Sequence, residues 1–483
     1  MRTFEQTEKA ARGYATVPVY DVIETGARTP DNVFPILKNL SRQCFILESA
    51  EGADRHGRYT FLGYDPKLEI TCRAGEFKLR GGAEITLPDA DPSEQIRKII
   101  EENRAPRIPE LPPFAGGLVG YFSYDYIKYA EPSLDLGAED LEGFKDVDLM
   151  LFDKVIAFDN LEEKIILIVN IKTDALLENY NRAAEEIASM RRIVKFGDSV
   201  KPPKLRLKSD FAPLFDRERY CAMVETAKHH IREGDIFQVV LSNRLAAEVE
   251  GSLFDTYCVL RETNPSPYMF YFSSDDIEIA GAAPETLVKL RDGVVSTFPL
   301  AGTRPRGATA EEDAQLEREL LCDPKELSEH NMLVDLGRND IGKISDFGSV
   351  KVEEYLTVER FSHVMHLGST VTGKLRDGLG GADAVNALLP AGTLSGAPKI
   401  RACEIIGALE GNRRGIYGGA IGYLAFNGDM DTCIAIRIAF KKNGRVFVRS
   451  GAGIVADSVP ETEFRECINK AQAVIDAIKE AAE

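Results

Sequence analysis

Residues 450–473 constrain the fold more than any other stretch, because they join an extended run, a glycine-rich segment and a helix. Residues 446–448 (VFV) are typical of a strand, and Gly451-Ala452-Gly453 follows shortly after. Glycine permits backbone conformations in which successive N–H groups point to one place. We therefore interpret 451–453 as a turn that leaves a strand and can receive a carboxylate or phosphate oxygen.

The helix after this segment carries charged side chains on one face. Glu463, Glu466 and Lys470 follow one another at spacings of three and four, which places them together. Cys467 and Ile475 belong to the adjoining apolar stripe, which should face a core. A solvated face with a Glu466–Lys470 pair is the simpler interpretation of this helix on its own.

A second pair of glutamates favours a functional site over a solvated helix face. Glu326 and Glu329 are also three residues apart, on a helix that Pro324 should begin with Asp323 as its N-cap. If the two pairs meet, four carboxylates repel one another unless they are protonated or bound to a cation. Oxygen ligands without a His or Cys cluster favour Mg²⁺ over Zn²⁺.

Composition excludes several functional classes. The net charge of −18 opposes binding to nucleic acid or to an anionic membrane surface, and no apolar run is long enough to span a membrane. The eight cysteines include no C-x-x-C, which is typical of a reducing cytoplasm. Residues 1–13 lack an apolar segment, so we expect no secretory signal and a cytoplasmic location.

The strand and domain pattern is partly readable. A proline-containing stretch without periodicity, 195–213, separates an N-terminal region (1–200) from a second region (214–483). Residues 151–158 and 164–171 are predicted to be paired strands, and 235–243 alternates with Phe237, Val239 and Leu241 on one face. Residues 434–440 are predicted to be one strand, in which Arg437 has space either to bind a carboxylate or to face solvent.

Longer motifs resemble a known family. The second half is similar to the chorismate-utilising enzymes, and the whole chain to the large, synthase components of anthranilate synthases. The matching stretches are DIFQVVLS (235–242), NPSPYMFY (264–271), AAPETLV (282–288), PLAGTRPRG (299–307), DPKELSEHNMLVDLGRND (323–340), RFSHVMHLGSTV (360–371), AGTLSGAPKIRA (391–402), YGGAIGY (417–423) and GAGIVADSVPETEFRECINKA (451–471).

This resemblance implies a fold and a reaction. The fold is of the α/β (α+β) class, a large sandwich of two mostly antiparallel sheets with helices outside. The reaction converts chorismate and ammonia into anthranilate and pyruvate with Mg²⁺, the first step of tryptophan biosynthesis. No segment resembles an amidotransferase, so glutamine-derived ammonia would come from a separate glutaminase (glutamine amidotransferase) subunit.

The same resemblance implies roles for individual residues. Glu285 would protonate the departing C4 hydroxyl, and His366, rather than His363, would assist pyruvate elimination. Thr393 and Gly302 would line the substrate. The metal would be held by Glu329 and Glu466, with Glu326 and Glu463 in or beside its shell. The ring carboxylate would meet the metal, the Gly451-Ala452-Gly453 segment and Lys470, and the enolpyruvyl carboxylate would meet Tyr417 and Arg437.

Two positions distinguish members of the family by their chemistry. Relatives that add water at C2 carry a lysine base where this chain has Gln238, and a neutral amide cannot act as that base. Relatives that make aminodeoxychorismate carry a nucleophilic lysine where this chain has Ala301. Direct amination at C2 remains. The alternatives are an enzyme that stops at aminodeoxyisochorismate, or an aminodeoxychorismate synthase component I.

A regulatory site is also implied. Glu48, Ser49, Pro267, Tyr268 and Met269 resemble the family's allosteric tryptophan site, where the Glu48 carboxylate would meet the ammonium group of the inhibitor. Arg58 is our candidate for a nearby basic residue. A strand end followed by a capped turn explains Glu48-Ser49 equally well from the local sequence.

Overall fold

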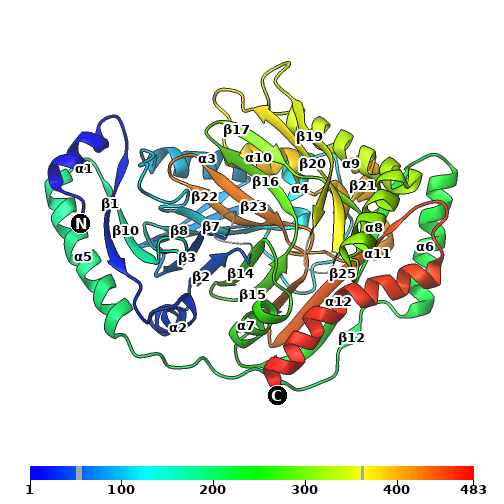
Figure 1. Ribbon diagram of the computed structural model, residues 1–483, viewed down its shortest axis with the longest axis horizontal. Helices are drawn as coiled ribbons and strands as arrows, with labels where there is room; N and C mark the ends of the chain where they lie inside the picture. The colour runs from blue at the N-terminus through cyan, green and yellow to red at the C-terminus, as the bar shows by residue number, and fades with distance from the viewer. Residues whose placement is uncertain (51–56, 361–363) are drawn as a thin grey trace.

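Two large sheets face each other, and helices cover their outer sides (Figure 1), as predicted. This computed structural model describes residues 1–50, 57–360 and 364–483. Neighbouring strands of both sheets, in the described residues, are paired antiparallel. Each sheet contains strands from both the 1–200 and the 214–483 regions, so the two regions share their cores.

The first sheet has 13 strands, in the order β1 (Thr16–Glu24), β10 (Lys164–Lys172), β9 (Lys154–Asp159), β3 (Tyr59–Tyr64), β2 (Cys44–Glu48), β14 (Tyr268–Ser273), β15 (Glu278–Ala283), β24 (Ile438–Lys442), β25 (Arg445–Ile454), β13 (Gln238–Glu250) and β11 (Arg206–Leu207), with β12 (Ala212–Pro213) and β21 (Gly396–Ala397) also paired to β13. The second has 12, in the order β18 (Leu300–Pro305), β20 (Val364–Lys374), β17 (Val294–Thr297), β16 (Thr286–Arg291), β23 (Met430–Ile434), β22 (Ala420–Ala425), β7 (Gly117–Phe122), β8 (Val147–Phe152), β4 (Leu68–Arg73), β5 (Glu76–Arg80) and β6 (Glu84–Pro88), with β19 (Lys351–Arg360) paired to β20.

The helices are α1 (Phe4–Ala11), α2 (Pro30–Leu40), α3 (Pro92–Glu102), α4 (Ile127–Ala130), α5 (Leu176–Phe196), α6 (Arg217–Arg232), α7 (Phe254–Thr263), α8 (Ala310–Cys322), α9 (Pro324–Gly342), α10 (Gly381–Leu388), α11 (Lys399–Glu410) and α12 (Pro460–Ala482). The predicted start of α9 is confirmed, because the Asp323 carboxylate accepts hydrogen bonds from the backbone N–H groups of Lys325 and Glu326. In the described residues no helix is both long and apolar enough to cross a membrane.

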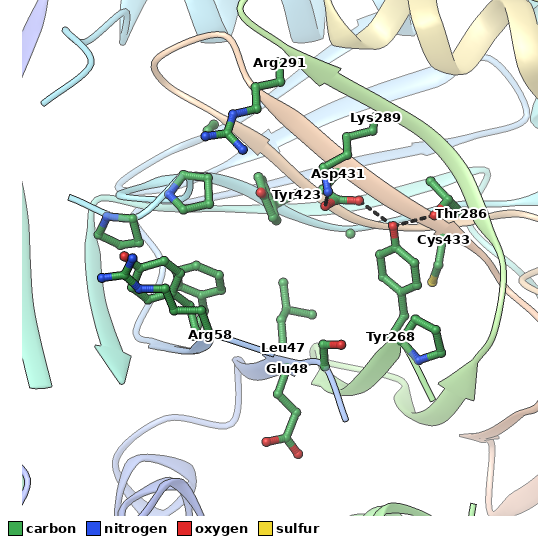
Figure 2. A pocket seen from close by; sticks show the side chains of 18 of the residues that line it. Leu47, Glu48, Arg58, Tyr268, Thr286, Lys289, Arg291, Tyr423, Asp431 and Cys433 are labelled. Carbon is green, nitrogen blue, oxygen red and sulfur yellow. Dashed lines mark hydrogen bonds and ion pairs between the residues drawn. The ribbon is translucent and has the colours of Figure 1, made fainter. Parts of the chain in front are cut away.

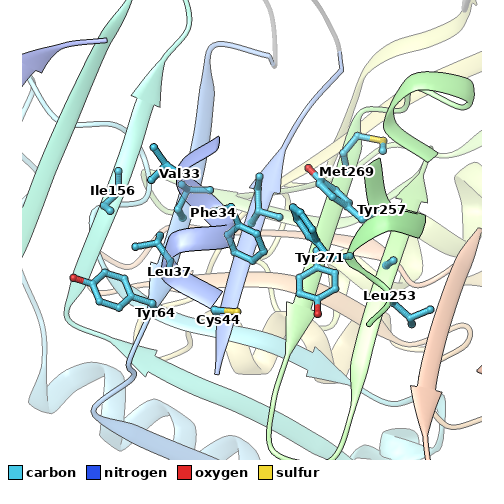
Figure 3. Close-up of a cluster of buried hydrophobic side chains, with 14 of the residues drawn as sticks. Val33, Phe34, Leu37, Cys44, Tyr64, Ile156, Leu253, Tyr257, Met269 and Tyr271 are labelled. Atoms are coloured by element: carbon cyan, nitrogen blue, oxygen red, sulfur yellow. The ribbon is translucent and has the colours of Figure 1, made fainter. Parts of the chain in front are cut away.

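Alternation along the strands divides the buried side chains between two environments. In β2, Phe45 lies in the core between the sheets, whereas Cys44 and Ile46 lie on the outer face of the first sheet. There they pack with α2, α7 and neighbouring strands, including Phe34 and Tyr271 (Figure 3). Helices α3, α9 and α10 cover the outer face of the second sheet in the same way.

Two strand predictions are wrong in detail. Residues 151–158 are not one strand, because the chain crosses at Asp153 from β8 in the second sheet to β9 in the first; only β9 pairs with β10. β8 and β9 are buried on both faces, so both are largely apolar in sequence. The sequence therefore shows no break where the chain passes from one sheet to the other. Phe237 precedes β13 and is 73% exposed, whereas Val239 and Leu241 are buried as expected.

Candidate functional site

Two segments cross between the sheets next to each other, and each carries a predicted site residue. Glu285 lies between β15 of the first sheet and β16 of the second, and Arg437 lies between β23 of the second and β24 of the first. The Ile434 N–H donates to the carbonyl oxygen of Glu285 (2.9 Å), and the Ala282 N–H donates to that of Arg437 (3.2 Å). The backbone thus fixes these two residues relative to each other.

The continuous strand predicted for 434–440 is wrong. β23 ends at Ile434, β24 begins at Ile438, and Arg437 has a φ of +54°, which side-chain-bearing residues rarely adopt. Apolar and other residues alternate throughout 434–440 because the segments on both sides of Arg437 are strands. These two strands belong to different sheets. Arg437 Nη1 donates to the carbonyl oxygen of Lys470 (2.8 Å), and burial lowers the pKa of the guanidinium.

Glu285 has the properties of a proton donor. Burial raises the pKa of its carboxyl from 4.5 to about 7, against the opposing effect of a hydrogen bond from Thr393 Oγ1 (3.0 Å). Thr393 lies in a short 3₁₀ helix, Gly392–Leu394. Near neutral pH a substantial fraction of this carboxyl is therefore protonated, as general acid catalysis requires.

The glycine segment is extended, contrary to the predicted turn. Gly451, Ala452 and Gly453 continue β25, where Gly451 pairs with Ser242 and Gly453 with Val240 of β13. The glycines are needed for close approach. A Cβ at Gly451 would lie 3.1 Å from the hydroxyl oxygen of Tyr417 and 2.7 Å from the Leu241 carbonyl oxygen. The structure thus brings Tyr417 against this strand without forming the predicted cradle.

Gln238 faces the same strand. A Cβ at Gly453 would lie 2.9 Å from Gln238 Nε2. The side-chain Oε1 of Gln238 is buried and has no hydrogen-bond partner in the described part of the chain. A buried amide oxygen in this condition is unusual, and it indicates a ligand or a solvent molecule at this position.

Gly302 and His366 meet near the first glutamate pair. The register of β18 against β20 shifts at Gly302, whose φ is +70° and whose Cβ would lie 3.1 Å from Glu326 Oε2. His366 Nδ1–H donates to the Gly302 carbonyl oxygen (2.8 Å), and burial lowers the pKa of the imidazole. His366 is therefore neutral at neutral pH and can accept a proton. His363 lies outside the described residues.

The two glutamate pairs influence each other but are not gathered around one point. Burial and the charges of Glu326 and Glu466 raise the pKa of Glu329, while Lys325 and Lys470 oppose this shift. Glu326 Oε1 lies 3.4 Å from Arg304 Nη1, and Glu466 Oε1 lies 2.6 Å from Lys470 Nζ. Among the described residues no three His, Cys, Asp or Glu side chains are close enough to hold one metal ion.

The donor chemistry nevertheless fits a hard divalent cation. Burial and the charge of Glu466 also raise the pKa of Glu463, against the effects of Ser458, Lys470 and Lys325. Carboxylates that repel one another in this way are stabilised when a cation neutralises them.

A cavity of about 1070 Å³ lies between the sheets, and the five predicted inhibitor-site residues contribute to its lining (Figure 2). Tyr268 from the first sheet reaches the second, where its hydroxyl lies 2.7 Å from Thr286 Oγ1 and 2.8 Å from Asp431 Oδ1. Thr286 is the residue next to Glu285. Arg58 also lines the cavity, and its guanidinium pairs with Asp159 (2.8 Å).

Glu48 differs from its predicted role. Its carboxylate points away from the cavity (Figure 2), where it binds Arg261 Nε (2.8 Å) and the hydroxyl of Tyr257. The side chain of Met269 likewise belongs to the outer cluster of the first sheet. The outward direction of Glu48 follows from the alternation of side chains along β2, because Leu47 and Glu48 must face opposite sides of the sheet.

Removing the Tyr268 hydroxyl should destabilise the fold. We expect Tyr268→Phe to lower the free energy of unfolding by about 1–2 kcal/mol, because Asp431 and Thr286 lose a buried partner. Urea unfolding followed by circular dichroism measures this. Tyr423→Phe is the matched control, since no hydrogen bond of the Tyr423 hydroxyl is found within the described residues. Equal effects of both substitutions would contradict the prediction.

Sequence reasoning missed a buried charged cluster formed by Glu410, Arg414 and Arg449. Arg414 and Arg449 both bind the Glu410 carboxylate, each at 2.6 Å, and all three side chains are at most 1% exposed. Charged residues beside glycines (Gly411 and Gly415) are typical of exposed turns. The spacing of four between Glu410 and Arg414 was the only local signal of a pair.

Comparisons with known proteins identify the family of this chain. The family model described as chorismate binding enzyme matches residues 42–476. Anthranilate synthase component 1 of Acetivibrio thermocellus is 43% identical over 100% of this chain and 99% of that protein. The corresponding protein of Acinetobacter calcoaceticus is 43% identical over 99% of this chain and 97% of its own length.

Solved structures show the same fold. The crystal structure of anthranilate synthase component I from Streptococcus pneumoniae TIGR4 superposes with a TM-score of 0.74 at 41% identity, covering 86% of this chain and 92% of that one. The menaquinone-specific isochorismate synthase of Escherichia coli, at 19% identity and a TM-score of 0.71 over 98% of both chains, shares the fold.

Proposed function

Because this chain belongs to the chorismate-binding enzymes, we propose that it is the synthase component of an anthranilate synthase. It would convert chorismate and ammonia into anthranilate, pyruvate and water, the first step of tryptophan synthesis. The observation that carries this proposal is the position of Glu285, a carboxyl with a pKa of about 7 at the junction of two crossing segments beside Arg437.

Each step has a residue of suitable chemistry. Glu285, held by Thr393, gives its proton to the oxygen of the departing C4 hydroxyl, which leaves as water. Ammonia is itself a nucleophile at C2, and the unpaired Oε1 of Gln238 can accept one of its N–H groups. Neutral His366 can take a ring proton as pyruvate is eliminated.

Arg437 and Tyr417 are the proposed partners of the enolpyruvyl carboxylate, and this role can be separated from folding. We expect Arg437→Ala and Arg437→Gly each to raise KM for chorismate about 10–100-fold, because a charge-assisted hydrogen bond is lost. Arg437→Gly should be about 1 kcal/mol more stable than Arg437→Ala, because glycine adopts a φ of +54° without strain. Steady-state kinetics and thermal unfolding measure both, and an unchanged KM would contradict the role.

Mg²⁺, a glutaminase partner and tryptophan inhibition are parts of the same proposal. Glu329 and Glu466 would hold Mg²⁺, with Glu326 and Glu463 beside them, and the ion would supply positive charge for the ring carboxylate. Lys470, whose Nζ lies 3.3 Å from the Gly451 carbonyl oxygen, is a further cation there. The relatives are named component 1, which implies a second component. We propose that this partner subunit supplies ammonia from glutamine.

The first experiment tests the reaction itself. Purified chain is incubated with chorismate, Mg²⁺ and ammonium at about pH 8.5, and anthranilate fluorescence and pyruvate are followed. We expect both products with ammonium and neither with glutamine alone. Chorismate consumption without anthranilate would instead identify an aminodeoxyisochorismate or aminodeoxychorismate synthase, and folded protein that consumes no chorismate would overturn the proposal.

Tryptophan inhibition is tested in the same assay. The cavity lies between the sheets, and Ser49 follows β2 on its wall. We expect tryptophan to inhibit the native chain. A Ser49→Phe substitution, which adds a ring at the wall, should raise the half-inhibitory tryptophan concentration at least about 10-fold by steric exclusion. Inhibition of equal strength in both proteins would place the inhibitor elsewhere.

A further inference from the structure

The buried cluster of Glu410, Arg414 and Arg449 has no part in the reaction proposed above, yet it lies directly behind the site. Glu410 ends α11, Arg414 follows it in a loop, and Arg449 lies in β25. Arg414 binds Glu410 through Nε (2.9 Å) and Nη2 (2.6 Å), and Arg449 binds it through Nη2 (2.6 Å). Two guanidinium groups therefore share one carboxylate without access to water.

The cluster joins backbone segments that carry separate site residues. Arg414 Nη1 donates to the carbonyl oxygen of Leu394 (2.6 Å), the residue after Thr393. Its Nη2 also donates to the carbonyl oxygen of Val240 (2.7 Å), which pairs with Gly453 across the ladder. One planar guanidinium thus links the loop that orients Glu285 to the strand beside the glycine segment.

Ser242 extends the link to Gly451. The Ser242 N–H and Oγ donate to Glu410 Oε1 (2.8 and 2.9 Å), and Arg449 Nε donates to Ser242 Oγ (2.8 Å). Ser242 pairs with Gly451, which approaches the Tyr417 hydroxyl. The Arg414 guanidinium carbon also lies 5.9 Å from the centre of the Tyr417 ring.

Burial energetics indicate that stability alone does not explain this cluster. Desolvating three charged side chains costs free energy that their mutual attraction often only offsets, and apolar replacements of such triads can be more stable. The guanidinium groups donate to backbone carbonyl oxygens in well-aligned hydrogen bonds, which hold the joined segments in a single arrangement. The catalytic rate depends steeply on how precisely an acid is positioned against its substrate.

We propose that Glu410, Arg414 and Arg449 form a positioning device that holds Thr393, Tyr417 and the Gly451–Gly453 strand in one arrangement around the substrate. This inference rests on the proposed function, because Thr393 acts through Glu285. The three residues are positioning residues, since none of them touches the reacting atoms. Their contribution should therefore be seen in turnover by folded protein.

The decisive variant is Arg414→Lys. A lysine keeps the positive charge, but one ammonium group cannot bind Glu410 and both carbonyl oxygens in the planar arrangement of a guanidinium. We expect kcat/KM for chorismate to fall about 30-fold, mostly in kcat, because misplacement by about 1 Å can cost up to about 100-fold. The assay is run well below the thermal midpoint, with circular dichroism confirming folded protein.

Asp148→Asn is the matched control. Asp148 is a fully buried carboxylate of β8 that binds Lys145 Nζ (3.0 Å) and Ser274 Oγ (2.8 Å), with no assigned role in the reaction. It should lose stability while keeping kcat within about twofold of the native value. If Arg414→Lys does not fold, Ser242→Ala, which removes the hydroxyl between Glu410 and Arg449, should lower kcat about 3–10-fold.

The outcomes are separable. An active native chain together with a folded Arg414→Lys or Ser242→Ala variant whose kcat is within twofold of native would overturn the positioning role alone. A native chain that consumes no chorismate would overturn the proposed function, and this inference with it. A loss of kcat in Arg414→Lys but not in Asp148→Asn supports the inference, because a general loss of packing would affect both.

Discussion

Replacing Glu285 by glutamine is expected to lower kcat for anthranilate formation about 10³-fold, the scale of a lost general acid. Glutamine keeps the shape of the side chain and can still accept the hydrogen bond from Thr393, but it cannot release a proton to the C4 oxygen. Chorismate affinity should change little, because the proposed binding groups, Arg437 and Tyr417, remain. Steady-state kinetics separate the two effects.

The control for this substitution lies in the preceding strand. Glu278 is a partly buried carboxyl (16% exposed), but Lys38 and Lys441 outweigh the effect of burial and lower its pKa to about 2. It is ionised at neutral pH and pairs with Lys441 Nζ (2.7 Å). Glu278→Gln should therefore cost stability while leaving kcat near its native value. A kcat for Glu285→Gln within tenfold of native would remove Glu285 from the role of acid.

The pH dependence follows from the sign of the shift. The pKa of Glu285 is raised to about 7, so the proton needed for catalysis is present below pH 7 and is lost above it. With free ammonia held saturating and constant at each pH, the native kcat should fall with rising pH through this range, in a plot of log kcat that approaches a slope of −1. The residual kcat of Glu285→Gln should not show this fall with pH.

The same shift predicts that native stability also falls as the pH rises. Between pH 4.5 and about 7 the unfolded chain binds fewer protons at this carboxyl than the native one, so native stability falls as the pH rises. Glutamine removes that penalty. We expect Glu285→Gln to be more stable than the native chain at pH 8, by on the order of 1–3 kcal/mol, and equally stable near pH 4. Urea unfolding at both values measures this.

Many strands and helix starts could be predicted from the sequence. The positions at which the chain passes from one sheet to the other could not. Apolar alternation located the strands on either side of Arg437, and the Asp323-Pro324 pair located the start of α9. Alternation reports only that a residue is extended and which side it faces. It does not report which sheet a strand joins, so the crossings at Asp153 and Arg437 were predicted as continuous strands.

Side-chain partners at long range were the second limit. The family resemblance implied that Glu285 and Thr393 lie at one substrate, and they are hydrogen-bonded although 108 residues apart. They could not show that Glu48 binds Arg261, or that Arg449 reaches Glu410, because those pairs depend on how α7 and α11 pack against the sheets. Glycines are unusual in strands, so Gly451 and Gly453 were predicted to form a turn. They are needed because Tyr417 and Gln238 approach the strand closely, and those contacts are visible only in the folded structure.

Removal of the proposed Mg²⁺ is expected to be the other change of large effect. With chorismate and ammonium present, EDTA should abolish anthranilate formation, and added Mg²⁺ should restore it. Glu466→Gln should lower kcat/KM by about 10²–10³-fold even at saturating Mg²⁺, because a neutral amide is a poor ligand for a hard cation and charge stabilisation by a metal is worth several kcal/mol. Lys470 would lose its partner at 2.6 Å but keep its charge.

Glu461→Gln is the matched control on the same helix, since Glu461 pairs with Arg217 Nε (2.6 Å) and is not among the proposed ligands. Mg²⁺ binding should also be measured without substrate, by calorimetry and by the rise in thermal midpoint that any ligand of the native state produces. The native chain and Glu461→Gln should show that rise, and Glu466→Gln should not. Because Glu329 carries a raised pKa partly through repulsion by Glu326 and Glu466, a cation that binds there relieves an unfavourable interaction already present in the fold. An equal rise in all three proteins would show that Mg²⁺ binds at a place other than these two helices.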